Sequence, residues 1–138
     1  MAQESIQAIM VWPGEHPCMT ELLNDRKFLD FAVGLGSAYT GDAVLIRLSD
    51  TVGVLYNDSA FLSDLKGNRK IGNKLLAGVF YVVGIKDGKL CSLPFAEMEE
   101  YYERFWEPES YTEAEVKEAC FADFRNDILE LEKTYFQD

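Results

Sequence analysis

His16 and Cys18 are the closest pair of residues in the chain that could carry out nucleophilic chemistry together. They lie two positions apart in "GEHPCM", so an extended backbone would direct both side chains to one face. A thiolate beside an imidazole could act as a nucleophile or supply part of a zinc site. A zinc site needs about four ligands, however, and the sequence has no second histidine and no other nearby cysteine. Because Pro17 between the two favours a loop, we predict no catalytic site, no metal and no cofactor.

A polar segment between residues 57 and 74 is the second candidate for chemistry. Its basic residues are interspersed with Gly67 and Gly72, as in loops that hold an anion or a phosphate. The G-x-x-x-x-G-K-[ST] spacing of a phosphate-binding loop is absent, which favours a solvated loop. Its bases could also face the acidic part of the chain. If a small ligand or anion binds here, the predicted residues are Asn57, Lys66, Arg69, Lys70 and Lys74.

The negative charge of the chain is concentrated in its last third. Residues 1–92 contain ten acidic and nine basic side chains, whereas residues 93–138 contain fourteen acidic and four basic ones. The last third therefore carries almost all of the formal net charge of −11. Direct binding of nucleic acid is disfavoured, because phosphate contacts need clustered Lys and Arg side chains.

The segment "PFAEMEEYYERFWEPE" has the periodicity of an amphipathic surface helix that ends at Pro108. Its apolar side is predicted to contain Phe95, Met98, Tyr102 and Phe105. Regularly spaced carboxylates on a rigid helix favour association with a basic partner. The predicted partner-binding residues are Glu97, Glu100, Glu103 and Glu107.

Length and composition indicate one packed domain. The chain has 138 residues, of which 48% are hydrophobic and 13% aromatic, sufficient for a core without metals or disulfides. The start of the chain lacks a basic signal-peptide region and a long apolar run, so we expect a cytoplasmic protein without a membrane segment. The three cysteines are predicted to be free thiols, with Cys91 and Cys120 buried and Cys18 more exposed.

Hydrophobic periodicity predicts an α+β fold with an antiparallel sheet of about five strands, one packed helix and two acidic helices at the C-terminal end. The first helix is expected from Thr20, as N-cap, to Leu35, and the last helix from about Thr112 to Phe136, with a capping box from Thr112 to Glu115. Asp87-Gly88 predicts a hairpin turn. We assign residues 1–109 to one domain and residues 110–138 to a helical extension of it. The predicted strands are residues 6–12, 43–49, 52–57, 75–86 and 89–93.

The order of these elements resembles the family catalogued as domain of unknown function 3846. The resemblance covers about residues 6–106 and rests on Asn57, on Ala77-Gly78 and on Ser92-Leu93 before the acidic helix. It implies an accessory protein of a phage, plasmid or integrative element that acts inside a bacterium, without implying an activity. It does not extend to residues 110–138.

Taken together, these patterns predict a non-enzymatic protein that binds a protein partner through its acidic helical surface. The partner is expected to be basic, such as a host nucleic-acid-binding factor that the protein inhibits as a DNA mimic. The alternative is a small-ligand or anion-binding protein that uses the loop between residues 57 and 74. The sequence leaves open whether the protein forms a homodimer.

Overall fold

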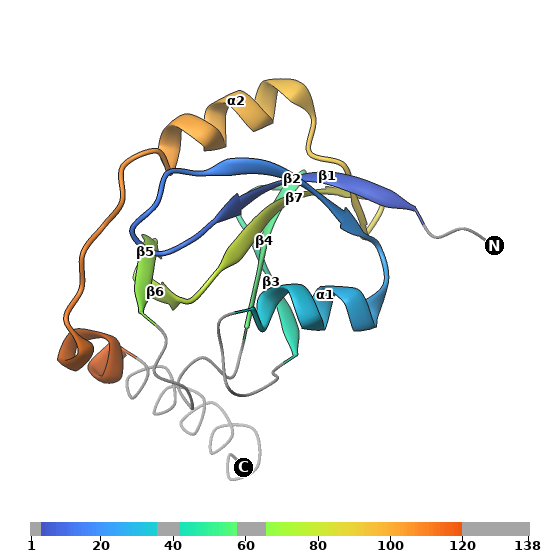
Figure 1. The fold of residues 1–138 in the computed structure, drawn as a ribbon. Coiled ribbons are helices and arrows are strands. Elements are labelled where there is room, and N and C mark those ends of the chain that lie inside the picture. Colours follow the sequence, from blue (N-terminus) through green and yellow to red (C-terminus); the bar gives the residue numbers. More distant parts are fainter. Residues whose placement is uncertain (1–3, 36–41, 58–65, 120–138) are drawn as a thin grey trace, which may run out of the picture.

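The computed structural model describes residues 4–35, 42–57 and 66–119. They form an α+β structure with one antiparallel main sheet, a small second sheet and helices on both sides of the main sheet (Figure 1). This arrangement confirms the predicted fold class. A further helical segment covers residues 113–119. The elements are β1 (Ser5–Val11), β2 (Cys18–Leu23), α1 (Arg26–Val33), β3 (Ala43–Arg47), β4 (Val52–Asn57), β5 (Gly67–Ile71), β6 (Lys74–Ala77), β7 (Phe80–Lys86), β8 (Lys89–Cys91) and α2 (Phe95–Arg104).

The main sheet has the strand order β2-β1-β7-β4-β3, with β8 paired to the end of β7. All of its described neighbours are antiparallel. In this part of the chain β2 and β3 are therefore its two edges. β5 and β6 form a separate antiparallel hairpin.

The two faces of the main sheet are covered by different helices, because successive side chains of a strand point to opposite faces. Ile9 and Val11 of β1 belong to the core beneath α2, whereas Ile6 and Ala8 belong to the core beneath α1. Figure 1 shows α2 and α1 on opposite sides of the sheet. Because the strands carry apolar side chains on both faces, the main sheet has one core on each side.

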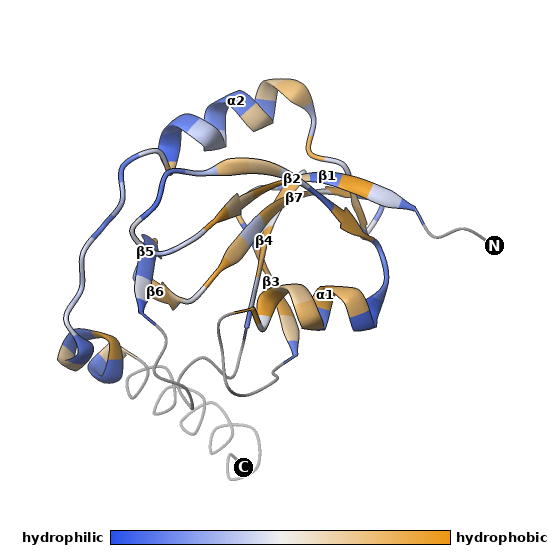
Figure 2. Ribbon diagram, viewed as in Figure 1, coloured by the Kyte–Doolittle hydropathy of each residue, from blue (hydrophilic) through white to orange (hydrophobic). Residues whose placement is uncertain are grey.

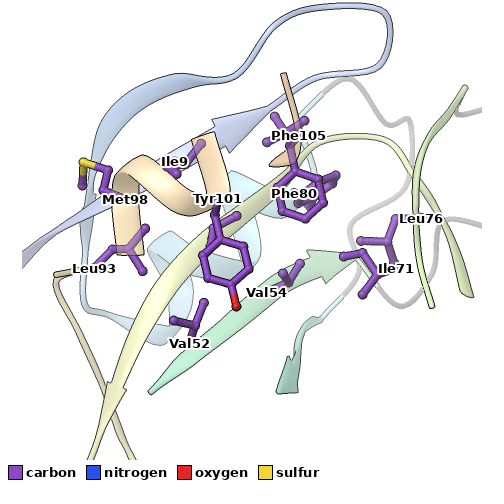
Figure 3. Packing of buried hydrophobic residues seen from close by; sticks show 12 residues of the cluster. Ile9, Val52, Val54, Ile71, Leu76, Phe80, Leu93, Met98, Tyr101 and Phe105 are labelled. Atoms are coloured by element: carbon purple, nitrogen blue, oxygen red, sulfur yellow. The ribbon is translucent and has the colours of Figure 1, made fainter. Parts of the chain in front are cut away.

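Aromatic side chains fill the core beneath α2. Figure 3 shows Tyr101 directed towards Val52 and Val54 of β4, with Phe105 beside Phe80 of β7. The rings of Phe80 and Phe105 pack edge to face, with their centroids 5.3 Å apart. This contact fixes the position of the C-terminal end of α2 over the sheet.

The predicted helix from Thr20 to Leu35 is wrong in its first part, which forms strand β2. Leu22 is buried and Glu21 is exposed, an alternation that fits the edge strand paired to β1. The helix begins only at Arg26, because the side chain of Asp25 accepts a hydrogen bond from the Phe28 N–H at 3.1 Å. Asp25, rather than Thr20, is the N-cap.

The predicted strand 75–86 is two strands, β6 and β7, that belong to different sheets. The chain turns between them at Gly78, whose φ of 77° is in the left-handed region that favours glycine. β5 was not predicted at all, because its sequence GNRKI is largely polar, as its hydrophilic colour in Figure 2 shows. The predicted hairpin turn at Asp87-Gly88 is confirmed, with φ values of 53° and 75°.

The chain after α2 packs against the β5–β6 hairpin. α2 ends at Arg104, a few residues earlier than predicted. The predicted capping box is confirmed, because the N–H groups of Thr112 and Glu115 each donate to the other's side chain, at 2.9 and 3.1 Å. A Cβ atom at Gly67 would lie only 2.9 Å from Val116 Cγ2 and 3.0 Å from Tyr111 Cβ. Glycine therefore permits this close approach. The rest of the predicted last helix lies outside the described residues.

Candidate functional site

A hollow of about 640 Å³ lies along the flank of α2 that faces β2. We call it the α2 groove. Positions four and seven residues after Phe95 lie on one stripe of α2, which places Glu99 and Tyr102 beside it, and Trp106 follows just after the helix end. The apolar residues that line the α2 groove are Met19, Phe95, Met98, Tyr102 and Trp106.

Several large apolar side chains of the α2 groove are exposed to solvent. The exposed fractions are 75% for Phe95, 62% for Met19 and 40% for Trp106. Single exposed apolar residues are common, but a contiguous group of them beside a hollow typically marks an interaction site. Covering one such side chain contributes roughly 1.5–3 kcal/mol to an association. The α2 groove is therefore suited to an apolar partner surface.

His16 holds Trp106 in place at one end of the α2 groove. The two rings are stacked with their centroids 4.0 Å apart and an angle of 9° between their planes. His16 Nδ1 also lies 2.6 Å from the carbonyl oxygen of Trp106, which accepts a hydrogen bond from it. The Tyr102 ring packs on the Trp106 ring, with their centroids 5.7 Å apart. The only histidine of the sequence thus positions a groove residue.

Cys18 and His16 form no site together in the described structure. His16 is occupied by Trp106, whereas Cys18 is exposed at the start of β2. Cys18 is the more exposed of the two described cysteines, as predicted, but Cys91 is half-buried rather than fully buried. Cys120 lies outside the described residues.

Three carboxylates lie along the α2 groove. Only two of the four predicted partner-binding acids are among them. Glu103 and Glu107 line it, together with Glu99, which was not predicted. Glu100 is exposed outside it. Glu97 faces the opposite flank of α2, where its Oε1 accepts a hydrogen bond from Thr51 Oγ1 at 2.7 Å. The groove acids therefore form a stripe shifted around the helix from the predicted one.

The acids of the α2 groove have no salt-bridge partner among the described residues. Within the ranges that the structure describes, no Lys, Arg or His nitrogen lies within 4.0 Å of a carboxylate of Glu99, Glu103 or Glu107. All three residues are exposed. Their charge is available to an external cation at the rim of an apolar surface.

Arg69, one of the predicted ligand-binding residues, is fully buried. Its Nη1 donates to the carbonyl of Trp12 at 3.1 Å and to the side-chain oxygen of Asn68 at 2.8 Å. Its Nη2 donates to the carbonyls of Glu15 and Phe105, both at 2.7 Å. Burial lowers the pKa of the guanidinium from its usual value. Arg69 thus joins the turn after β1 to the end of α2.

Asn68 completes this buried polar network. Its side-chain nitrogen donates to the carbonyl oxygens of Val11 and Gly78, at 2.9 and 2.8 Å. Together with Arg69 it satisfies buried carbonyl groups that would otherwise lack partners. Two buried polar residues of β5 therefore hold the hairpin against the main sheet.

Two of the predicted lysines of the basic segment contact different aromatic rings. Lys70 Nζ lies 5.7 Å from the ring centroid of Tyr111, and Lys74 Nζ lies 5.1 Å from that of Tyr56. Such cation–π contacts use the positive charge within the molecule. Lys74 lies opposite Ile71, the neighbour of Lys70, so the side chains of the two lysines point to opposite faces of the β5–β6 hairpin.

A second hollow, of about 450 Å³, lies where residues 109–117 meet β5. Lys66 and Lys117 line it, but so do Glu109 and Glu113, so its lining is mixed in charge. Asn57 lies elsewhere, buried at the end of β4 opposite Ala43. The predicted ligand-binding residues are therefore distributed over several environments.

Comparisons of the chain with protein-family models, with curated proteins and with solved structures give no match. The resemblance to the domain of unknown function 3846 family therefore stays a prediction. Within the described residues, no helix is long and apolar enough to cross a membrane, and no group of three or more His, Cys, Asp or Glu side chains could hold a metal ion.

Proposed function

We propose that this chain is a non-enzymatic protein-binding module whose α2 groove takes up a partner segment with apolar and basic side chains. The observation that carries the proposal is the combination of an exposed apolar surface with three carboxylates that have no salt-bridge partner within the described residues. Aromatic and methionine side chains of this kind supply most of the affinity in protein interfaces. The carboxylates would select basic residues of the partner.

Charge distinguishes this partner from a second copy of the chain. Two copies that met at their α2 grooves would bring six carboxylates together, and like charges at an interface cost binding free energy. A partner rich in Lys or Arg removes that repulsion. The basic partner would associate faster at low salt, because the net charge of −11 on this chain then attracts it with less screening.

The sequence suggests a biological setting for this binding. We propose that the protein acts in the cytoplasm of a bacterium as an accessory protein of a mobile element, and that it inhibits a basic, nucleic-acid-binding host protein. An acidic surface of this kind can occupy a site that normally binds phosphate groups. The alternative, a ligand held by residues 57–74, has less support, because Arg69 is buried and Lys70 and Lys74 point to opposite faces of the β5–β6 hairpin, each towards a tyrosine ring.

The charge of the α2 groove can be tested with two variants that each remove three negative charges. One replaces the groove acids with glutamine (Glu99→Gln, Glu103→Gln, Glu107→Gln). The matched control replaces exposed acids elsewhere (Glu100→Gln, Glu113→Gln, Glu118→Gln). Fluorescently labelled peptides of Lys and Leu serve as probes, with Glu-and-Leu peptides as negative controls. We expect the groove variant to weaken binding by about tenfold at low salt and the control by about twofold.

The apolar contribution has its own matched pair. Phe95→Ser removes an exposed ring from the α2 groove, whereas Phe31→Ser removes a ring of 63% exposure from α1, on the other face. Binding of the Lys-and-Leu peptides should weaken in Phe95→Ser and stay unchanged in Phe31→Ser. Equal binding by all of these variants would show that the peptides associate with the overall charge, and it would overturn the proposed function.

A further inference from the structure

The backbone of β2 has an open edge beside the α2 groove. In the described chain β2 pairs with no strand except β1. The backbone groups of Gln7 in β1 do not take part in that pairing. Its N–H donates to Ser92 Oγ and its carbonyl accepts from the Leu93 N–H, both at 2.9 Å. Gln7 therefore directs both backbone groups away from β2.

Backbone groups of successive residues in a strand point to alternate sides, so Ile6, Ala8 and Met10 are the β1 residues that bond to β2. The carbonyl of Glu4 continues this alternation, because it accepts a hydrogen bond from the N–H of Asn24 at 2.8 Å. The β2 residues opposite these three are Leu22, Thr20 and Cys18.

The residues between them, Met19 and Glu21, must direct their N–H and carbonyl groups outward. None of the hydrogen bonds within the described residues uses these four groups. The next outward carbonyl, that of Leu23, is already used by the N–H of Asp25 at 2.8 Å. Met19 and Glu21 thus form a short open template for another strand.

This template faces the same side as the α2 groove. Met19 lies directly opposite Ile9, which belongs to the core beneath α2, so the two side chains share a face of the sheet. Met19 accordingly lines the α2 groove. A strand added beside β2 would place every second side chain in the groove, next to Tyr102 and Trp106 of the helical side.

We propose that the partner segment binds in an extended conformation, as an additional strand on the outer edge of β2. The inference rests on the proposed function and specifies the form of its ligand. Backbone hydrogen bonds to Met19 and Glu21 set the register, as in other complexes in which a peptide extends a sheet. One alternate set of side chains faces the groove, with an apolar residue beside Met19 and basic residues near Glu21, Glu103 and Glu107.

A helical segment is the competing occupant. An α-helix bonds its own backbone groups internally and would leave the N–H and carbonyl groups of Met19 and Glu21 without partners. It would also place its apolar residues at a spacing of three and four instead of two. The two occupants therefore differ in the sequence pattern that binds and in the role of the peptide backbone.

The test uses two peptides of about nine residues with the same numbers of Lys, Leu and Gln. In one peptide Lys and Leu occupy every second position, and in the other they follow helical spacing. Two further versions of the alternating peptide carry backbone N-methyl groups, one on its odd and one on its even residues. Because one set of N–H groups faces β2, we expect one methylated version to lose about tenfold in affinity and the other to stay within about twofold.

Variants of the protein give a second readout. Glu21→Pro removes one outward N–H group without removing a backbone bond to β1, although it also removes the side-chain hydrogen bond that Gln7 Nε2 donates to Glu21 Oε1 at 2.6 Å. Glu21→Gln is the matched control, because it retains both the N–H group and a side-chain oxygen that can accept from Gln7. The proline variant should weaken the alternating peptide by about tenfold and the glutamine variant by about twofold. Circular dichroism and thermal unfolding establish that both are folded.

The outcomes separate this inference from the proposed function. Preference for the helically spaced peptide, or equal effects of both methylated versions, would overturn the strand model and leave the proposed function intact, provided that the groove variant still weakens binding. Absence of binding by every peptide would overturn both. Weak binding of one methylated version and of Glu21→Pro supports the added strand.

Discussion

The acidic stretch 97–107 and the basic stretch 66–74 each contain regularly spaced charges, but the fold uses them differently. The basic stretch turns its only arginine into the interior and places two lysines over tyrosine rings. The acidic stretch leaves Glu99, Glu103 and Glu107 beside an open apolar surface. A cluster of charges is thus a candidate site only where the molecule does not already supply its partners.

The largest effect is expected from Arg69→Met. The substitution removes the donors from the buried carbonyl of Phe105 and from the partly buried carbonyls of Trp12 and Glu15, and an unsatisfied buried carbonyl costs roughly 1–3 kcal/mol. We expect the free energy of unfolding, measured with urea, to fall by about 3 kcal/mol or more. Lys70→Met is the control, because it changes the adjacent, exposed residue of β5. A similar small loss in both variants would contradict the structural role of Arg69.

A smaller loss is expected from Gly67→Ala. The added methyl group would overlap Val116 Cγ2 and Tyr111 Cβ, so these two residues must move away from β5. We expect a loss of about 1–3 kcal/mol in the free energy of unfolding. The double variant Gly67→Ala with Val116→Ala should recover part of it. If Gly67→Ala proved as stable as the parent, the packing of residues 110–119 on β5 would be in error.

The ionisation of Tyr111 tests whether Glu109, near the basic stretch, accepts a hydrogen bond from within the molecule. Burial, together with the hydrogen bond to Glu109 and its charge, raises the pKa of Tyr111 from 10.0 to about 12. The folded state therefore retains this proton more strongly than the unfolded state. The resulting stability is present below pH 10 and is lost as the pH rises from 10 through about 12.

Absorbance at a wavelength that reports tyrosinate would follow this ionisation. Tyr111→Phe should remove one late-ionising tyrosine from the titration curve. Glu109→Gln should shift that tyrosine towards its ordinary value, because it removes the nearby negative charge. If Tyr111→Phe instead removed a tyrosine that ionises near pH 10, Tyr111 would not have the raised pKa.

The smallest effect on stability is expected from the acids of the α2 groove. Glu99, Glu103 and Glu107 are exposed and have no salt bridge within the described residues, so their replacement by glutamine removes little from the folded state. We expect the free energy of unfolding to change by less than about 0.5 kcal/mol. The same substitutions should weaken peptide binding about tenfold. A large loss of stability would mean that these carboxylates serve the fold.

The sequence by itself determined the elements whose pattern is local. Runs of β-prone apolar residues indicated β1, β3, β4 and, as part of one longer predicted strand, β7. The pair Asp87-Gly88 indicated a hairpin turn, and Thr112 with Glu115 indicated a capping box. The helical period also placed a run of acids on α2. These features depend on neighbouring residues in the chain, whose types encode backbone conformation directly.

Only the tertiary structure decided where the charges and the open apolar surface lie. β5 and β2 were missed, because one is stabilised by buried hydrogen bonds of Asn68 and Arg69 and the other by pairing with β1. The stripe of Phe95, Glu99, Tyr102 and Trp106 could have been found from helical spacing, but not the arrival of Met19 beside it. The sequence specifies which side chains are present, whereas contacts between distant segments follow from how the sheet and helices pack.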